Sequence, residues 1–335
     1  MLRAVILRLL VYLGLPLLAV GVLWGVSIRM PGRSFAGAPP PLSAEERATA
    51  ERLRRDVTVL ADSIGDRDAR TAYAGLARAS AWLQRQGTAI AGRPPRVQEY
   101  QASGRAVQNL EFALSTGDQR QPLVVGAHYD AIAVTRGADD NASGVAVVLE
   151  LMRRLRATPA DCPVLAVLFT NEEPPYFYSD SMGSLVYARA LVARGMRPRA
   201  MFSLESVGYF SDAPGSQEYP PLLGWFYPDR GDFIAIVGNV ASRALVHRTI
   251  ADFRRVATLP SAGSAAPGWF PGVGWSDHWA FWQVGVPAVM VTGTAPYRNR
   301  NYHESTDVVG TLDFGRMARV VTGVERVLRE ACRAA

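Results

Sequence analysis

The chain has 335 residues, 49% of them hydrophobic, so it is long enough for one large α/β domain with a sizeable core and is not a disordered chain. Its net charge of +6 comes from arginine alone, because the sequence contains no lysine, and this excludes P-loop, Schiff-base and kinase-type lysine chemistry. The arginines are scattered among acidic residues without a nucleic-acid-binding motif, so we expect no nucleic-acid partner.

The N-terminal segment Leu9–Ile28 carries no charge over 20 positions, the length that a bilayer-spanning helix requires. We therefore expect 1–30 to be a membrane anchor. Because the tail before it is very short, we expect the catalytic domain to be exported, either to the periplasm or to the cell exterior. The alternative is a signal peptide cleaved at the A-x-A sequence at 36–38, which would release a secreted protein.

A Pro/Gly linker occupies 31–42, and one domain is expected over 43–335. Ser43 and Glu46 form a capping box that predicts a helix start, and apolar periodicity predicts the elements that follow. The expected helices begin at Ser43 and then cover 73–87, 143–156, 183–195, a segment between 237 and 287, and 314–332. The expected strands cover 97–101, 110–114, 123–127, 164–170, 201–204, 233–237 and 287–291.

Strands that alternate with helices predict an α/β fold of three layers, α/β/α, around a mixed and mostly parallel central sheet. The stretches 212–231 and 259–274 are rich in Gly, Pro and aromatic residues, and we expect them to be long surface loops. The two cysteines, Cys162 and Cys332, fit no zinc or redox motif. They are compatible with a disulfide in an oxidising compartment and equally with two buried thiols.

Polar side chains follow three of the predicted strands, where open α/β sheets bind their ligands. His128 and Asp130 follow the first of these strands, Glu172 and Glu173 the second, and Glu205 the third. If the second strand continues through its glutamates, the two carboxylates point to opposite faces and at least one faces inward, where it needs a cation.

Further polar motifs lie at 137–144 (GADDNASG), 276–278 (SDH) and 302–303 (YH). Each candidate has a structural alternative: the two aspartates of the first motif would cap a helix, His128 would be a hydrogen-bonded core histidine, and Glu172 would pair with an arginine. The chain has no nucleophile elbow, no H-E-x-x-H and no catalytic-cysteine motif. The joint pattern therefore favours a metal site.

The motifs HYD, GADDNASG, NEEPP, FSLE, SDH and YHESTD, taken in this order, resemble those of the co-catalytic di-zinc exopeptidases of the aminopeptidase Y and bacterial leucyl aminopeptidase type. The resemblance covers the chain from about Ser43 onward. It implies the zinc exopeptidase fold, two zinc ions per chain and a peptide substrate.

Residue by residue, the resemblance implies that His128 and Glu205 hold one zinc ion and that Glu173 and His303 hold the other, with Asp140 bridging both. A hydroxide between the ions would attack the peptide bond. The resemblance further implies that Glu172 is the general base and that Asp130 orients His128. Other polar residues of these motifs are expected only to support the ligands: Asp139, Ser276, Asp277 and His278.

Two features depart from the family pattern. Glu205 stands where many relatives carry the shorter aspartate, and a lengthened segment at 174–181, which we expect to border the substrate pocket, follows Glu173. The complete set of five ligands and a base favours a zinc-dependent aminopeptidase that hydrolyses N-terminal residues from peptides. The alternatives are a glutaminyl-cyclase-like zinc acyltransferase of the same fold and a non-catalytic, receptor-like relative.

Overall fold

The computed structural model describes residues 24–114, 121–221 and 223–333, together with Tyr12, Gly14 and Gly21. Most of the predicted membrane segment Leu9–Ile28 therefore lies outside the described residues. Within the part that is described, no helix combines the length and the apolar character needed to cross a bilayer.

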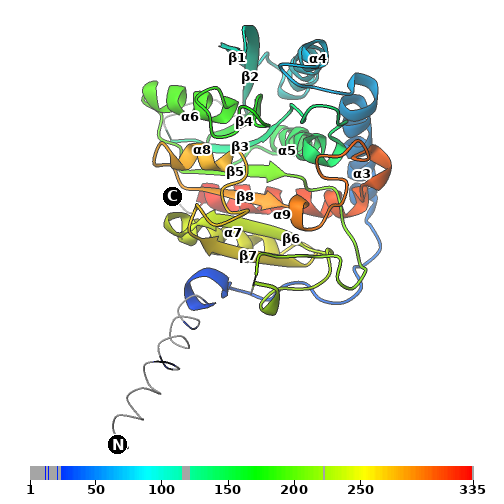
Figure 1. Cartoon of the computed structure of the whole chain (residues 1–335), viewed down its shortest axis with the longest axis vertical. Helices are drawn as coiled ribbons and strands as arrows, with labels where there is room; N and C mark the ends of the chain where they lie inside the picture. The colour runs from blue at the N-terminus through cyan, green and yellow to red at the C-terminus, as the bar shows by residue number, and fades with distance from the viewer. Residues whose placement is uncertain are drawn as a thin grey trace, which may run out of the picture.

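A mixed sheet of eight strands forms the centre of the described domain, in the order β1-β2-β4-β3-β5-β8-β6-β7 (Figure 1). Its central strands β4, β3, β5 and β8 are parallel, whereas β2 pairs antiparallel with β4 and β6 pairs antiparallel with β8. At the edges, β1 pairs antiparallel with β2, and β7 pairs parallel with β6. The strands are β1 (Arg96–Ala102), β2 (Arg105–Ala113), β3 (Leu123–His128), β4 (Val164–Phe169), β5 (Ala200–Glu205), β6 (Ile234–Asn239), β7 (Ser261–Ala266) and β8 (Ala288–Thr292).

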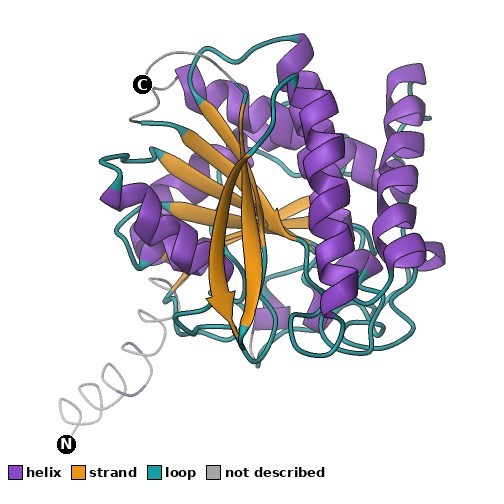
Figure 2. Cartoon of the chain, turned by 90° about the horizontal axis from the view of Figure 1, so that it is seen from above, coloured by secondary structure: helices purple, strands orange, loops and turns teal. Residues whose placement is uncertain are grey.

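Helices cover both faces of the sheet, as Figure 2 shows, so the predicted three-layer arrangement is confirmed. Leu123 and Val125 of β3 face one apolar core and Val124 faces the other, as alternation along a strand requires. The first core holds α3 (Ala44–Thr58), α4 (Tyr73–Ala91), α5 (Gly144–Ala157), α7 (Arg243–Arg254) and α9 (Phe314–Arg333). The second holds α6 (Gly183–Ala193) and α8 (His278–Trp282).

The capping box predicted at the start of the domain is present. The Ser43 hydroxyl accepts from the Glu46 backbone N–H, and the Glu46 carboxylate accepts from the Ser43 backbone N–H, so α3 begins where the sequence predicts. Leu53, Val57 and Leu60, whose spacing predicted one apolar face, are fully buried.

One predicted loop is wrong in part, because 259–274 contains strand β7. The residues of β7 are Ser, Ala and Gly, so they lack the alternation of bulky apolar side chains by which a strand is recognised. What makes them a strand is pairing with β6, in register from Ser261 opposite Ile234 to Ala266 opposite Asn239. The other predicted loop, 212–231, contains the short helical turn η5 (Leu223–Trp225).

The strand that precedes Glu172 and Glu173 does not continue through them, so the condition under which they would point to opposite faces is not met. Strand β4 ends at Phe169, and Asn171 then adopts a left-handed backbone conformation (φ 55°), so both glutamates lie on a loop. The Asn109 side chain takes over the pairing at this point, since its Oδ1 accepts the Thr170 backbone N–H at 3.0 Å. The loop, and not strand alternation, aims the two carboxylates.

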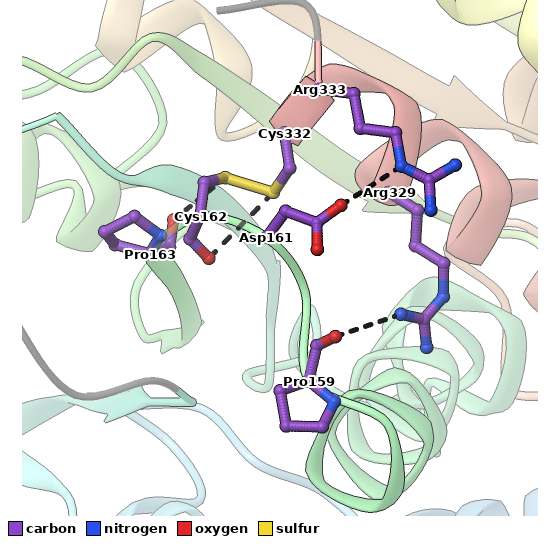
Figure 3. The surroundings of a disulfide bond; sticks show 7 residues. All are labelled: Pro159, Asp161, Cys162, Pro163, Arg329, Cys332 and Arg333. Atoms are coloured by element: carbon purple, nitrogen blue, oxygen red, sulfur yellow. Dashed lines mark hydrogen bonds and ion pairs between the residues drawn. A yellow bond between two sulfur atoms is a disulfide. The ribbon is translucent and has the colours of Figure 1, made fainter.

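A disulfide joins Cys162, just before β4, to Cys332 near the end of α9, and Figure 3 shows its surroundings. The sequence had left pairing and free thiols equally open. Beside the disulfide, Arg333 donates to the Asp161 carboxylate at 3.1 Å. Because the bond spans 170 residues of sequence, it removes conformational freedom from the unfolded chain, about 5 kcal/mol by the chain-entropy account.

Candidate metal centre

The carboxyl ends of three neighbouring strands bring the predicted metal ligands together. His128 is the last residue of β3, Glu205 is the last residue of β5, and the loop with Glu172 and Glu173 follows β4, the other neighbour of β3. All four side chains are buried. This is the edge of the sheet at which an open α/β fold binds its ligands.

A first group of potential ligands consists of His128, Asp140 and Glu205. The Nε2 atom of His128 lies 3.3 Å from Asp140 Oδ1 and 3.3 Å from Glu205 Oε2. Ligand atoms of the three residues all lie within 4.8 Å of one another, close enough to share one ion.

A second group consists of Asp140, Glu173 and His303. The Nε2 atom of His303 lies 3.2 Å from Asp140 Oδ2 and 3.4 Å from Glu173 Oε2. Asp140 thus directs one carboxylate oxygen to each group. A ring stack with Tyr302, at 3.8 Å between centroids, fixes the orientation of His303.

Unpartnered polar atoms show that these residues fit a metal. Both ring nitrogens of His128, Nε2 of His303 and Oε1 of Glu173 are buried without a hydrogen-bond partner among the described residues. Buried polar atoms are normally hydrogen-bonded, and imidazole nitrogen with carboxylate oxygen is a donor set that zinc accepts. Divalent cations would satisfy Nε2 of His128, Nε2 of His303 and Oε1 of Glu173, whereas Nδ1 of His128 faces Asp130.

Glu172 also takes part in a third possible group, with His128 and Glu173. Its Oε2 atom lies 3.8 Å from His128 Nε2, farther than the oxygens of Asp140 and Glu205. Glu172 is therefore placed beside the first group rather than within it.

Burial shapes the acid–base properties of the cluster. Burial, and to a smaller extent the negative charge of Asp140, raises the pKa of Glu173 to about 8. Burial also raises the pKa of Glu172 well above its usual range. Burial opposes ionisation of Asp140 too, but His128 and His303 outweigh it and lower the Asp140 pKa. So many carboxylates in a dry site need cations to stay ionised together.

Asp130 supports both sides of the cluster. Its two carboxylate oxygens accept the backbone N–H groups of Glu172 (3.2 Å) and Glu173 (3.1 Å), and Oδ1 lies 3.5 Å from His128 Nδ1. One buried carboxylate therefore sets the positions of the loop after β4 and of the imidazole at the end of β3.

Glu205, which departs from the family pattern, is held by neighbouring donors. Ser276 Oγ donates to its Oε2 at 2.7 Å, Asn141 Nδ2 donates to the same oxygen at 3.3 Å, and Ser206 Oγ donates to its Oε1 at 2.9 Å. These contacts restrain a side chain that is one methylene longer than aspartate. Ser276 was predicted as a support, and the structure places it in contact with this candidate ligand.

The other predicted supports lie around the cluster. Asp139 accepts the Gly208 backbone N–H at 2.7 Å and the Asn299 side-chain amide at 2.9 Å, so it ties the GADDNASG motif to two distant loops. Asp277 is buried, and His278 contacts the Val273 carbonyl through Nε2 at 2.7 Å.

Asp307 supports the candidate metal site, although it was not predicted from the sequence. The Asp307 carboxylate accepts the backbone N–H groups of Asp139 (2.8 Å) and Asp140 (3.1 Å), and so positions the backbone of the shared ligand. Asp307 closes the YHESTD motif, so a signal was available. Arg67 was missed as well: it is fully buried and donates to the carbonyls of Tyr129 (2.9 Å) and Gly137 (3.0 Å), and no sequence motif marks it.

No residue of segment 174–181 lines the cavity beside Asp140, Glu172 and Glu205, and the place of this segment at the substrate pocket stays a prediction. Within the segment, the Tyr178 hydroxyl donates to the Gly274 carbonyl at 3.0 Å and its ring packs against Trp279, so these aromatic side chains join the loop to α8 instead.

The chain matches a peptidase family model and is similar to known relatives. The model of peptidase family M28 matches residues 109–327. A protein of Escherichia coli (strain K12) described as uncharacterized protein YfbL is 38% identical over 297 residues, which are 85% of this chain and 90% of that protein. A probable leucine aminopeptidase of Arthroderma otae is 26% identical over 228 residues, 63% of this chain but only 55% of the relative.

Solved structures share the fold at low sequence identity. A zinc aminopeptidase from Bacillus subtilis aligns with a TM-score of 0.64 at 14% identity, over 84% of this chain and 94% of its own. Glutaminyl cyclase of Porphyromonas gingivalis aligns with a TM-score of 0.63 at 19% identity, over 84% and 98%. At these identities the likeness concerns the fold alone.

Proposed function

Because the chain belongs to peptidase family M28, as its motifs predicted, we propose that it is a zinc-dependent aminopeptidase that hydrolyses N-terminal residues from peptides. The observation that carries the proposal is the pair of ligand groups that share Asp140, one oxygen directed to each. A carboxylate placed between two imidazoles in a dry site suits two cations better than one.

In this proposal His128 and Glu205 hold one zinc ion, Glu173 and His303 hold the other, and Asp140 binds both. Zinc would supply Lewis acidity and a lowered pKa for bound water. Three ligand carboxylates bring enough negative charge to offset most of the positive charge of two ions. Asp130 orients His128, as a carboxylate commonly does for a metal-bound imidazole.

Glu172 is proposed as the general base. It lies in the cavity with Asp140 and Glu205, it is not needed to complete either ligand group, and burial raises its pKa well above the usual range. A carboxylate with a raised pKa can accept a proton from the attacking water and donate it to the leaving amine.

We also propose that the catalytic domain is exported and membrane-anchored. The uncharged run Leu9–Ile28 supports the anchor. The disulfide Cys162–Cys332 supports export, because such bonds persist in oxidising compartments.

The test is digestion of a peptide library by the full chain in detergent micelles, with and without a chelator, read by mass spectrometry. The proposal expects stepwise loss of N-terminal residues that the chelator abolishes and zinc restores. Metal analysis should find two zinc ions per chain. Absence of chelator-sensitive trimming would contradict the proposal. Cyclisation of N-terminal glutaminyl peptides by a chain that holds one zinc ion would establish the cyclase alternative instead.

A further inference from the structure

A cavity of about 180 Å³ extends from the carboxylates that could bind metal to the C-terminal end of the predicted anchor. Asp140, Glu172 and Glu205 line it, and so do Ser27 and Ile28 of the short helical turn η2 (Trp24–Ile28). The walls between them are mostly apolar and include Phe233, Val237, Ala262, Ala266, Phe270 and Met290.

The strand order sets the length of this cavity. Glu205 ends β5, while η2 packs against β7, and the strands β8 and β6 lie between them. Three spacings between neighbouring strands amount to about 14 Å. The cavity is therefore longer than a leucine side chain needs, and the segment at η2 bounds its far side, below β7 in Figure 1.

The chain from η2 to Ser34, which bounds the cavity, is attached to the domain by hydrogen bonds and side-chain packing. Arg254 of α7 donates to the Pro31 carbonyl at 2.7 Å, and the Ser34 hydroxyl accepts the backbone N–H of Ser261, the first residue of β7, at 2.8 Å. Met30 fills space at Gly263, where even an added Cβ would come within 2.9 Å of it. The segment thereby covers the edge strand β7, which would otherwise expose unpaired backbone groups.

Ser27 and Ile28 are themselves buried, with 5% and 9% of their surface exposed, although each belongs to a segment predicted to enter the membrane. Between them they present one hydroxyl and one branched apolar side chain to the cavity. Arg29, the next residue, is exposed and does not line it.

From this geometry we infer that Ile28, with Ser27, forms the end wall of the substrate pocket and sets the longest apolar N-terminal side chain that the enzyme accepts. The inference rests on the proposed aminopeptidase function and names its substrate class: peptides whose first residue carries an apolar side chain longer than leucine. A form cleaved at 36–38 would lack this wall and would differ in selectivity from the anchored form.

The test uses the zinc-loaded full chain in detergent micelles and a series of amino-acid p-nitroanilides, with straight side chains that lengthen from alanine to eight carbons. We expect kcat/KM to rise beyond the length of leucine in the unaltered protein. Ile28→Trp should lower kcat/KM for the longest substrates at least tenfold and leave the alanyl substrate within twofold. Ile28→Ala should move the preferred length upward, and the exposed-site control Arg29→Ala should change neither.

Calorimetric binding of straight-chain primary amines to the metal-free full chain separates this inference from the proposed function. Amine affinity should increase with chain length, and Ile28→Trp should weaken the longest amines selectively. If no anilide is hydrolysed but Ile28→Trp selectively weakens binding of the longest amines, the aminopeptidase proposal fails and the inference that Ile28 forms the end wall is supported. If Ile28→Trp leaves the ratio of long to short ligands unchanged in both assays, while the protein melts at its usual temperature, the end wall is overturned.

Discussion

The two ends of the cavity differ in polarity. At the polar end, Asp140, Glu172 and Glu205 are buried carboxylates. Ser276 donates a hydrogen bond to Glu205, and Asp130 accepts the backbone N–H of Glu172, so both positions are held in place. At the apolar end, η2 packs against β7, a strand made only of Ser, Ala and Gly. In the proposed function, the chemistry would depend on the positions of charges at the polar end, and the apolar end would select substrates by shape and length.

The largest effect is expected from Asp140→Asn at the polar end. Because Asp140 directs one oxygen to each ligand group, its loss should remove zinc from both groups and activity with it, by about 10³-fold or more. Metal analysis and peptidase assays check this result. His303→Ala should cost one ion rather than two, and retention of both ions in Asp140→Asn would contradict a shared ligand.

Glu172→Gln should separate activity from metal binding. The amide cannot take up a proton, so we expect a loss of about 10²–10⁴-fold in kcat with both zinc ions retained. The exposed glutamate Glu51 serves as a matched control, and Glu51→Gln should leave kcat unchanged. Full activity in Glu172→Gln, or loss of metal from it, would remove Glu172 from the role of base.

Asp307→Asn tests whether the backbone that carries Asp140 must be anchored. An amide retains one acceptor but places a donor against a backbone N–H, so zinc affinity should fall about 10–100-fold. Competition with a chelator measures the affinity. Asp180→Asn, at a surface ion pair, is the control and should bind zinc normally.

The metal-free protein should lose stability as the pH rises. Burial raises the pKa of Asp139 to about 6, of Asp277 and Asp307 to about 7 and of Glu173 to about 8, so between pH 4 and pH 8 the folded state holds more protons than the unfolded state. The free energy of unfolding should then decrease as the pH rises through this window.

Urea denaturation in the presence of a chelator measures this slope. Zinc should flatten it, because the cation takes over the stabilisation of the ionised carboxylates. A free energy of unfolding that rises with pH in the metal-free protein would argue against the buried excess of carboxylates.

The smallest effect is expected from Tyr227→Phe at the apolar end. Tyr227 lines the cavity and its hydroxyl donates to the Gly263 carbonyl of β7 at 2.8 Å, so the change should cost about 1 kcal/mol of stability and leave zinc content intact. Thermal unfolding and metal analysis check both. Tyr73→Phe, which removes a hydrogen bond to the Ala106 carbonyl outside this cavity, is the matched control and should also keep its zinc. Loss of zinc in Tyr227→Phe would contradict the separation of the metal site from the apolar end.

Local signals in the sequence were sufficient for much of the fold. The capping box at Ser43, the apolar periodicity of α5 and α9 and the apolar run of β4 all reflect preferences that neighbouring residues satisfy by themselves. Strand β7 escaped prediction because its small residues become a strand only by pairing with β6 and by accepting cover from the N-terminal segment.

The sequence by itself determined which side chains could bind metal, since His128, Glu205 and the glutamates after β4 stand at strand ends whatever the details of packing. The family resemblance already implied that Asp140 is shared, and the tertiary structure directs one of its oxygens to each group. Only the tertiary structure decided that Asp307 holds Asp140 there and that Cys162 meets Cys332. It also decided that Ile28 lines the cavity. The physical reason is that residue type and spacing govern local geometry, whereas contacts between distant segments depend on how the sheet and its edges are covered.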